Sequence, residues 1–228
     1  MEGFFNMDSK WMKALSKLFD LMLVNILTLL CSIPIITIGA SFSAMHFMMY
    51  RLYKNDEGYI IRSYFGFFKK NFRQSTLMWL VYLLILLILG IDQYVLNQGV
   101  LELNSVIQIV VIIIAVIWLI SFVWVFVMQS RYLNPIRITM KNSMLVGLTH
   151  PIRTVLMIIV FLLPIPVMLL ISWGLPICIL FGLTVPAYIQ CRMYAKVFAQ
   201  IEGTDKDREN NGENSDSGWL SNDDDFVQ

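Results

Sequence analysis

Long apolar runs separated by short polar stretches dominate the chain. Three of these runs are easily delimited, at residues 76–96, 105–128 and 154–173. Because about 20 apolar residues cross the hydrocarbon core of a bilayer at ~1.5 Å each, every one of these runs is long enough to span a membrane. A fourth run follows closely at 175–197. It contains Pro186, which a membrane helix tolerates where neighbouring groups satisfy the freed carbonyl.

The first apolar region is interrupted at residues 31–41 by the sequence CSIPIITIGAS, so it is either one kinked span or two spans joined by a turn. Lysines precede the region, and Arg51 and Lys54 follow it. Positive residues gather on the cytosolic side of a membrane, and two basic flanks therefore favour a hairpin. We predict spans at 19–35 and 38–54 with an outer turn between them. The candidate turn or partner-contact residues are Pro34, which would end a helix, Gly39 and Ala40, and Ser41, which would cap the next helix.

The distribution of lysine and arginine also orients the later spans. The connections at 97–104 and 172–174 contain neither residue, whereas the connection at 129–153 contains four basic residues: Arg131, Arg137, Lys141 and Arg153. By the positive-inside rule the first two connections face outward and the third faces the cytosol. The predicted fold is an all-α, polytopic transmembrane helix bundle of six spans, with both termini cytosolic.

Composition agrees with a membrane protein. Of the 228 residues, 57% are hydrophobic and 14% are charged, and the mean hydropathy is +0.68; a soluble domain has far more charge. The first span is expected to remain as a signal anchor, because no short core with a cleavage site follows the basic start. All three cysteines lie in apolar runs, which argues against a disulfide framework or a zinc site.

Three segments combine apolar residues at helical spacing with basic residues. Residues 1–18 are predicted to form an interfacial amphipathic helix, and similar stripes occur at 62–73 and 133–147. Such helices most simply hold a protein against anionic lipid, and the alternative is that they dock a partner. From Glu202 to the end the chain has nine acidic and two basic residues, and this tail at 202–228 is predicted to be disordered.

Sequence patterns for catalysis are scarce. We find no glycine-rich phosphate loop, no helical histidine pair with a glutamate and no serine elbow, so we nominate no catalytic, cofactor or metal residue and expect no enzyme. Polar residues inside membrane spans are functional candidates by default, and here they are Asn25, His46 and Gln108. They would serve either a bound ion or proton relay, or helix packing.

Four stretches resemble the YesL family of bacterial integral membrane proteins: GFFNMDSK at 3–10, LLCSIPIITIGAS at 29–41, DEGYIIRSYFGFFKKNFRQST at 56–76 and RYLNPIRITMKNSM at 131–144. The resemblance implies a multi-pass protein of the plasma membrane, mainly in Gram-positive bacteria. It also implies genes near sugar importers of the ABC type and polysaccharide-degrading enzymes. The family provides no catalytic or ligand residues to transfer to this chain.

Two functions follow as hypotheses. The first is a non-enzymatic protein accessory to oligosaccharide uptake by an ABC-type importer, with the lipid bilayer and the importer's permease subunits as partners and no nucleic acid. The second is a small secondary transporter or channel that acts on its own, for which acidic coupling residues near the middle of the membrane would be expected. The apolar runs have no acidic residue near their middle, and this favours the accessory role.

Overall fold

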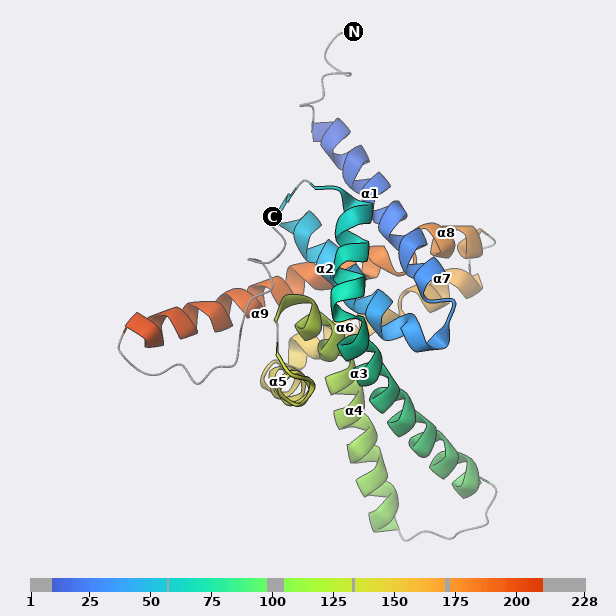
Figure 1. Cartoon of the computed structure of the whole chain (residues 1–228). Helices are drawn as coiled ribbons and strands as arrows, with labels where there is room; N and C mark the ends of the chain where they lie inside the picture. Colours follow the sequence, from blue (N-terminus) through green and yellow to red (C-terminus); the bar gives the residue numbers. More distant parts are fainter. Residues whose placement is uncertain (1–9, 57, 98–104, 133, 171–172, 211–228) are drawn as a thin grey trace, which may run out of the picture.

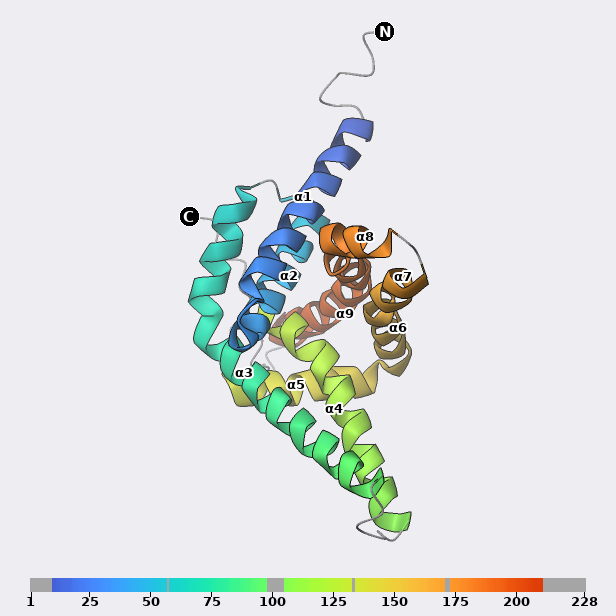
Figure 2. The same ribbon diagram turned by 90° about the vertical axis from the view of Figure 1, so that its right-hand side faces the viewer.

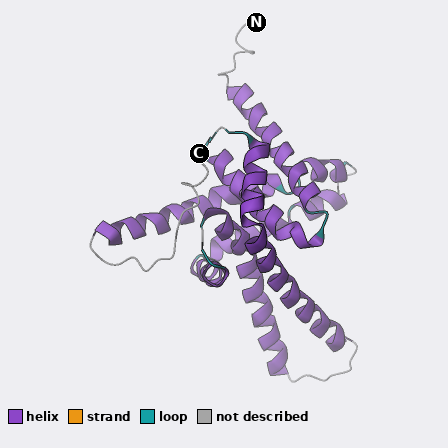
Figure 3. Ribbon diagram, viewed as in Figure 1, coloured by secondary structure: helices purple, strands orange, loops and turns teal. Residues whose placement is uncertain are grey.

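The computed structural model describes residues 10–56, 58–97, 105–132, 134–170 and 173–210. Helices account for the ordered elements in these ranges, and no strand occurs among them (Figures 1 and 3). The elements are α1 (Lys10–Cys31), the short 3-10 helix η1 (Ile35–Thr37), α2 (Ile38–Tyr53), α3 (Ile60–Asn97), α4 (Ser105–Arg131), α5 (Ile136–Thr149), α6 (Pro151–Leu162), α7 (Pro164–Leu170), α8 (Gly174–Phe181) and α9 (Thr184–Asn210). The all-α prediction is confirmed.

Several helices have the length and composition of membrane spans. Within the described residues these are Trp11–Cys31, Ile60–Val95, Gln108–Arg131 and Pro151–Leu170. The bent pair α8 and α9 makes a fifth if its two parts, which meet at 50°, are counted as one span. The chain is therefore a multi-pass membrane protein. The second arm of the predicted hairpin, α2, has 16 residues and is shorter than a full span.

Helix α2 occupies the centre of the bundle. It packs against α1, α3, α4 and α9, as Figure 2 shows from the side, and eleven of its 16 residues are buried. The ring of Phe47 stacks on Phe67 of α3 at 4.4 Å between centroids, and His46 meets Tyr194 of α9 edge-on. The aromatic stripe at 62–73 thus packs partly against α2, whereas we expected it to lie on lipid.

Helices α1 and α3 are longer than the spans predicted for them. Each continues through a segment that we had expected to be a separate interfacial helix, because no proline occurs in 1–33 or in 35–134 to end it. At ~1.5 Å per residue, the 38 residues of α3 extend about 57 Å, well beyond a hydrocarbon core of about 30 Å. The helix is therefore longer than one perpendicular crossing requires, and its basic residues are in its first part.

The outer parts of α3 and α4 form a two-helix arm, comprising residues 84–97 and 105–119. Figures 1 and 2 both show this pair leading away from the rest of the bundle. The arm leaves the bundle where the indole nitrogen of Trp118 donates to the Tyr82 carbonyl at 3.2 Å. Beyond that contact, the two helices run apart from the other described helices in both views.

Prolines divide the second half of the chain into shorter helices. Pro135 and Pro151 delimit α5, so a separate helix occurs within the segment 133–147, although residue 133 lies outside the described residues; its place at a membrane interface stays a prediction. The predicted span at 154–173 is broken at Leu163 before Pro164, and the span at 175–197 is broken at Gly182 and Leu183. Helix α9 continues to Asn210, so the predicted tail boundary at 202 lies inside a helix.

Candidate functional site

The connection between α1 and α2 is tighter than predicted. Thr37 closes it, because its hydroxyl donates to the carbonyl of Cys31 at 2.6 Å, and the Trp79 indole fastens it to α3 by donating to the Ile35 carbonyl at 2.8 Å. Pro34 is exposed in this turn, as expected. Gly39, Ala40 and Ser41 are not turn residues: they lie in the first turns of α2 and are buried.

Gly39 serves close packing between helices. A Cβ atom added there would lie 2.5 Å from the carbonyl oxygen of Ser75 and 2.5 Å from the Cβ of Trp79, both on α3. Only a residue without a side chain allows this approach of α2 to α3. The expected partner-contact patch at 39–41 therefore makes a contact inside the chain, and it is not open to another protein.

Asn25 of α1 holds the break between α8 and α9. Its side-chain nitrogen donates to the Ile179 carbonyl at 2.7 Å. Its side-chain oxygen accepts from the backbone N–H groups of Leu183 and Thr184 at 2.9 and 3.0 Å, and from the Thr184 hydroxyl at 3.3 Å. The first N–H groups of a helix have no partner within it. Asn25 thus supplies the hydrogen bonds that an apolar environment cannot, and its role is structural.

His46 lies in the middle of α2 with 6% of its surface exposed. Its Nδ1 has no hydrogen-bond partner among the described residues. The Tyr194 hydroxyl donates to the His46 backbone carbonyl at 3.4 Å, and the two rings meet edge-on at 6.0 Å. Gln108, in contrast, is exposed near the beginning of α4. The contacts of Asn25, His46 and Gln108 do not join them into one site.

Side-chain amides that we did not nominate, two of them buried, hold α3 to α4. Gln74 donates to the side chain of Gln129 at 3.1 Å and to the carbonyl of Asn134, and Gln129 donates in turn to Asn71 at 3.3 Å. Gln129 is fully buried. The signal in the sequence was a glutamine at the end of a strongly apolar run, but its partners lie more than 50 residues away.

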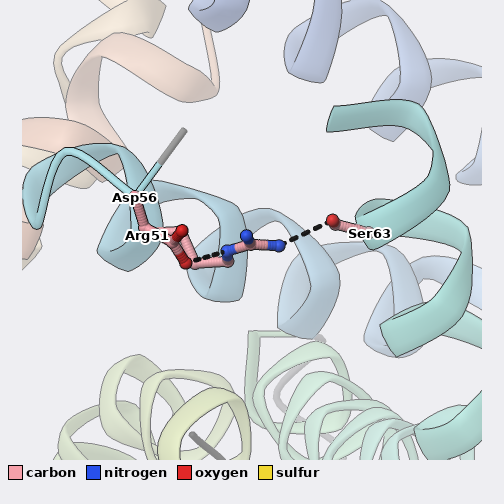
Figure 4. A network of polar contacts seen from close by, with 3 residues as sticks. All are labelled: Arg51, Asp56 and Ser63. Atoms are coloured by element: carbon pink, nitrogen blue, oxygen red, sulfur yellow. Dashed lines mark hydrogen bonds and ion pairs between the residues drawn. The ribbon is translucent and has the colours of Figure 1, made fainter. Parts of the chain in front are cut away.

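The connection between α2 and α3 is fixed by Arg51, as Figure 4 shows. Its guanidinium donates to the Asp56 carboxylate and to the Ser63 hydroxyl, both at 2.6 Å. Asn55, two residues after the end of α2, has a φ of 55°, and the N–H of Asp56 donates to the Arg51 carbonyl at 3.0 Å, which is a Schellman arrangement. The hydrogen bond from Arg51 lowers the pKa of Asp56; partial burial opposes this shift, and the guanidinium charge adds to it.

Comparison with known proteins gives one match, to a family model. Searches of curated proteins and of solved structures find no significant match to the chain. The segment that does match a family covers the second half of α1, all of α2 and α3 as far as Gln93, so it contains the central helix, the tight turn and the contact at Gly39. Residues 21–93 match the model of a protein family described as Protein of unknown function, DUF624.

Proposed function

We propose that this chain is a non-enzymatic accessory subunit of an ABC-type carbohydrate importer in the bacterial plasma membrane. In this proposal α2 and the bent pair α8 and α9 complete six crossings, and both termini are cytosolic. The observation that carries the proposal is the α3–α4 arm. It extends from the bundle, the rest of the described chain leaves most of it uncovered, and a groove and small residues on it would let a second helix pack closely.

The exposed surface of the arm runs along both helices. In α4, Ile112, Ile113 and Ile114 are 57%, 51% and 48% exposed. A shallow groove of about 230 Å³ runs between the two helices, and Gln93 is its one polar lining residue. The residues that line this arm groove are Leu89, Gln93, Val111, Ile112, Ala115, Val116 and Leu119.

Small residues on the arm favour a transmembrane helix as the occupant. Helices associate in lipid mainly through close packing, and small residues at the contact permit it. Gly90 of α3 is exposed, with nothing within 4 Å of a Cβ added to it, and Ala115 of α4 lines the arm groove. We therefore assign the occupant as a transmembrane helix of the importer's permease subunit.

The contacts inside the bundle support an accessory role over independent transport. A transporter needs polar groups near the middle of the membrane that can engage a substrate or ion. Both polar ends of Asn25 are engaged by backbone groups of α8 and α9. Gln190, also buried, donates to the Met157 carbonyl at 2.8 Å. Asn25 and the Gln190 nitrogen are thus engaged within the chain, which favours a structural role for them; the His46 Nδ1, which has no partner among the described residues, is the group that the transporter alternative would use.

Site-specific photo-crosslinking in cells tests the arm. A photoreactive residue at Ile112 should give an adduct with a permease subunit, identified by mass spectrometry. The same residue at Ile152, which is 76% exposed on α6, is the control and should give no such adduct. Equal crosslinking at both positions, or no permease adduct at Ile112, would contradict the proposal.

A matched pair of glycine variants tests the same surface by copurification. Gly90→Phe should reduce the permease recovered with the chain at least fivefold, because the new ring occupies the contact. Gly66→Phe is the control, since Gly66 also lies on α3 with open space around it but outside the arm. Uptake of an oligosaccharide by the purified chain alone in liposomes would replace this proposal with the transporter.

A further inference from the structure

A basic pocket lies where α1, α2, α6 and α9 meet. It has a volume of about 660 Å³ and is lined by Lys17, Tyr53, Arg153, Tyr188, Arg192, Met193 and Lys196. Four of these seven residues are cations, and none of the seven carries a carboxylate. The fold therefore brings together positive charges from the first and last parts of the chain, which repel one another unless an anion lies between them.

Contacts within the basic pocket hold its cations in place and leave donors available. The Arg192 guanidinium lies over the Tyr188 ring at 5.5 Å. Arg153 donates one bond to Gln200 at 3.1 Å, and Lys17 donates to Asn55. A guanidinium has five N–H donors and an ammonium has three. Each cation therefore retains donors for an anion after its contact within the chain.

The basic pocket lies at the edge of the apolar membrane region. Arg153 is in the first turn of α6, where the span Pro151–Leu170 begins. One helical turn from the pocket, Leu156 follows Arg153 and Ile189 precedes Arg192; these side chains are 45% and 41% exposed. A ligand that fills the site would meet cations at one end and apolar side chains at the other.

We propose that the basic pocket binds the headgroup of an anionic phospholipid that carries two phosphates, such as cardiolipin. Phosphate oxygens accept from arginine in a two-point geometry, and lysine adds a mobile charge. Basic pockets between transmembrane helices are suited to such headgroups. Four cations allow two for each of the two phosphodiester groups, and the exposed leucine and isoleucine beside the pocket provide contacts for acyl chains.

Native mass spectrometry of the full chain in detergent provides the test. Cardiolipin should bind at least tenfold more tightly than phosphatidylcholine. Arg192→Gln with Lys196→Gln should abolish this preference, and both side chains are exposed, so the fold is expected to persist. The control, Arg62→Gln with Lys69→Gln, removes two exposed α3 cations outside the pocket and should change cardiolipin affinity less than twofold.

Two further experiments identify the ligand and the place where it binds. Inorganic pyrophosphate tests for a soluble ligand, and it should not displace cardiolipin at millimolar concentration; displacement would overturn the assignment to lipid. Photoactivatable cardiolipin added to the unmodified chain should label peptides containing residues 188–196. Labelling spread evenly over the basic helices, or equal losses of affinity in the two double variants, would show non-specific attraction and overturn the site.

Discussion

Helix α2 contains two serines, a histidine and a glycine, yet eleven of its 16 residues are buried. The arm half of α4 is almost wholly aliphatic, yet Ile112, Ile113 and Ile114 are each about half exposed. In a soluble protein the more hydrophobic helix would be inside. Lipid tails are as apolar as leucine, so moving an isoleucine from lipid into protein gains little. Hydrophobicity alone therefore does not decide which helix is central: small residues in the first half of α2 allow close packing, and larger residues such as Phe47 and Met49 fill the core in its second half.

Helix α5 follows the same rule on a smaller scale. Its buried residues are Thr139, Ser143, Val146 and Gly147, whereas Leu145 and Leu148 are 54% and 47% exposed. The Ser143 hydroxyl lies 3.2 Å from that of Ser121 on α4. Polar and small side chains thus make the helix contacts, and large apolar ones remain on the surface.

The largest effect is expected from enlarging the glycine of the buried helix. Gly39→Leu places side-chain atoms where a Cβ alone would be 2.5 Å from a backbone oxygen. Overpacking of this kind costs about 3 kcal/mol or more, and α2 and α3 must separate. We expect loss of the monodisperse species in size-exclusion chromatography.

Gly90→Leu on the arm is the matched control for that change. Nothing lies within 4 Å of a Cβ at this position, and leucine favours helix over glycine by about 1 kcal/mol or less. The thermal midpoint in detergent should stay the same or rise slightly. An equal loss of stability from Gly39→Leu and Gly90→Leu would show that the arm is packed as tightly as α2.

The two glycines also show where sequence reasoning reaches its limit. Pattern alone predicted helices, membrane spans and the separate α5, because apolar runs and prolines are local signals. Gly39 lies five residues after Pro34, and a glycine needed for a turn can have the same local sequence as one needed for close packing. Its partners, Ser75 and Trp79, are more than 30 residues away, so the sequence could not distinguish the two roles.

Asn25 was identified as a candidate from the sequence, but its function was not. A polar residue in an apolar run indicates that some partner exists, and here that partner is a helix break more than 150 residues later. Gly182 and Pro186 could mark the break in the sequence. The sequence could not show that the break lies against α1. The basic pocket was missed for the same reason, since its cations belong to separate basic clusters.

An intermediate effect is expected when Asn25 loses its polar end. Asn25→Leu leaves the Ile179 carbonyl and the Leu183 and Thr184 N–H groups without their partner, and each unsatisfied buried group costs about 1–3 kcal/mol. For three groups at the lower end of this range the cost is about 3 kcal/mol, and at roughly 2–4 °C per kcal/mol for a chain of this size the thermal midpoint should fall by about 6–12 °C. Gln108→Leu, exposed on the arm, should leave the midpoint within about 1 °C. A larger fall in the thermal midpoint for Gln108→Leu than for Asn25→Leu would show that Gln108 on the arm, and not Asn25, stabilises the fold.

The smallest effect belongs to the exposed ion pair that connects α2 to α3. The Asp56 side chain is 54% exposed, so Asp56→Asn should lower the thermal midpoint at pH 7 by less than about 2 °C, in keeping with exposed pairs.

The pKa of Asp56 is lowered from its ordinary value of 3.8. The contribution of the pair is therefore complete above pH 3.8 and is lost as the pH falls through the lowered pKa. The difference between the parent chain and Asp56→Asn should be constant from pH 5 to pH 8 and should close below 3.8. Ser63→Ala removes the other bond of Arg51 and should show no such closure. A difference that already closes near pH 6 would mean that another group titrates in this connection.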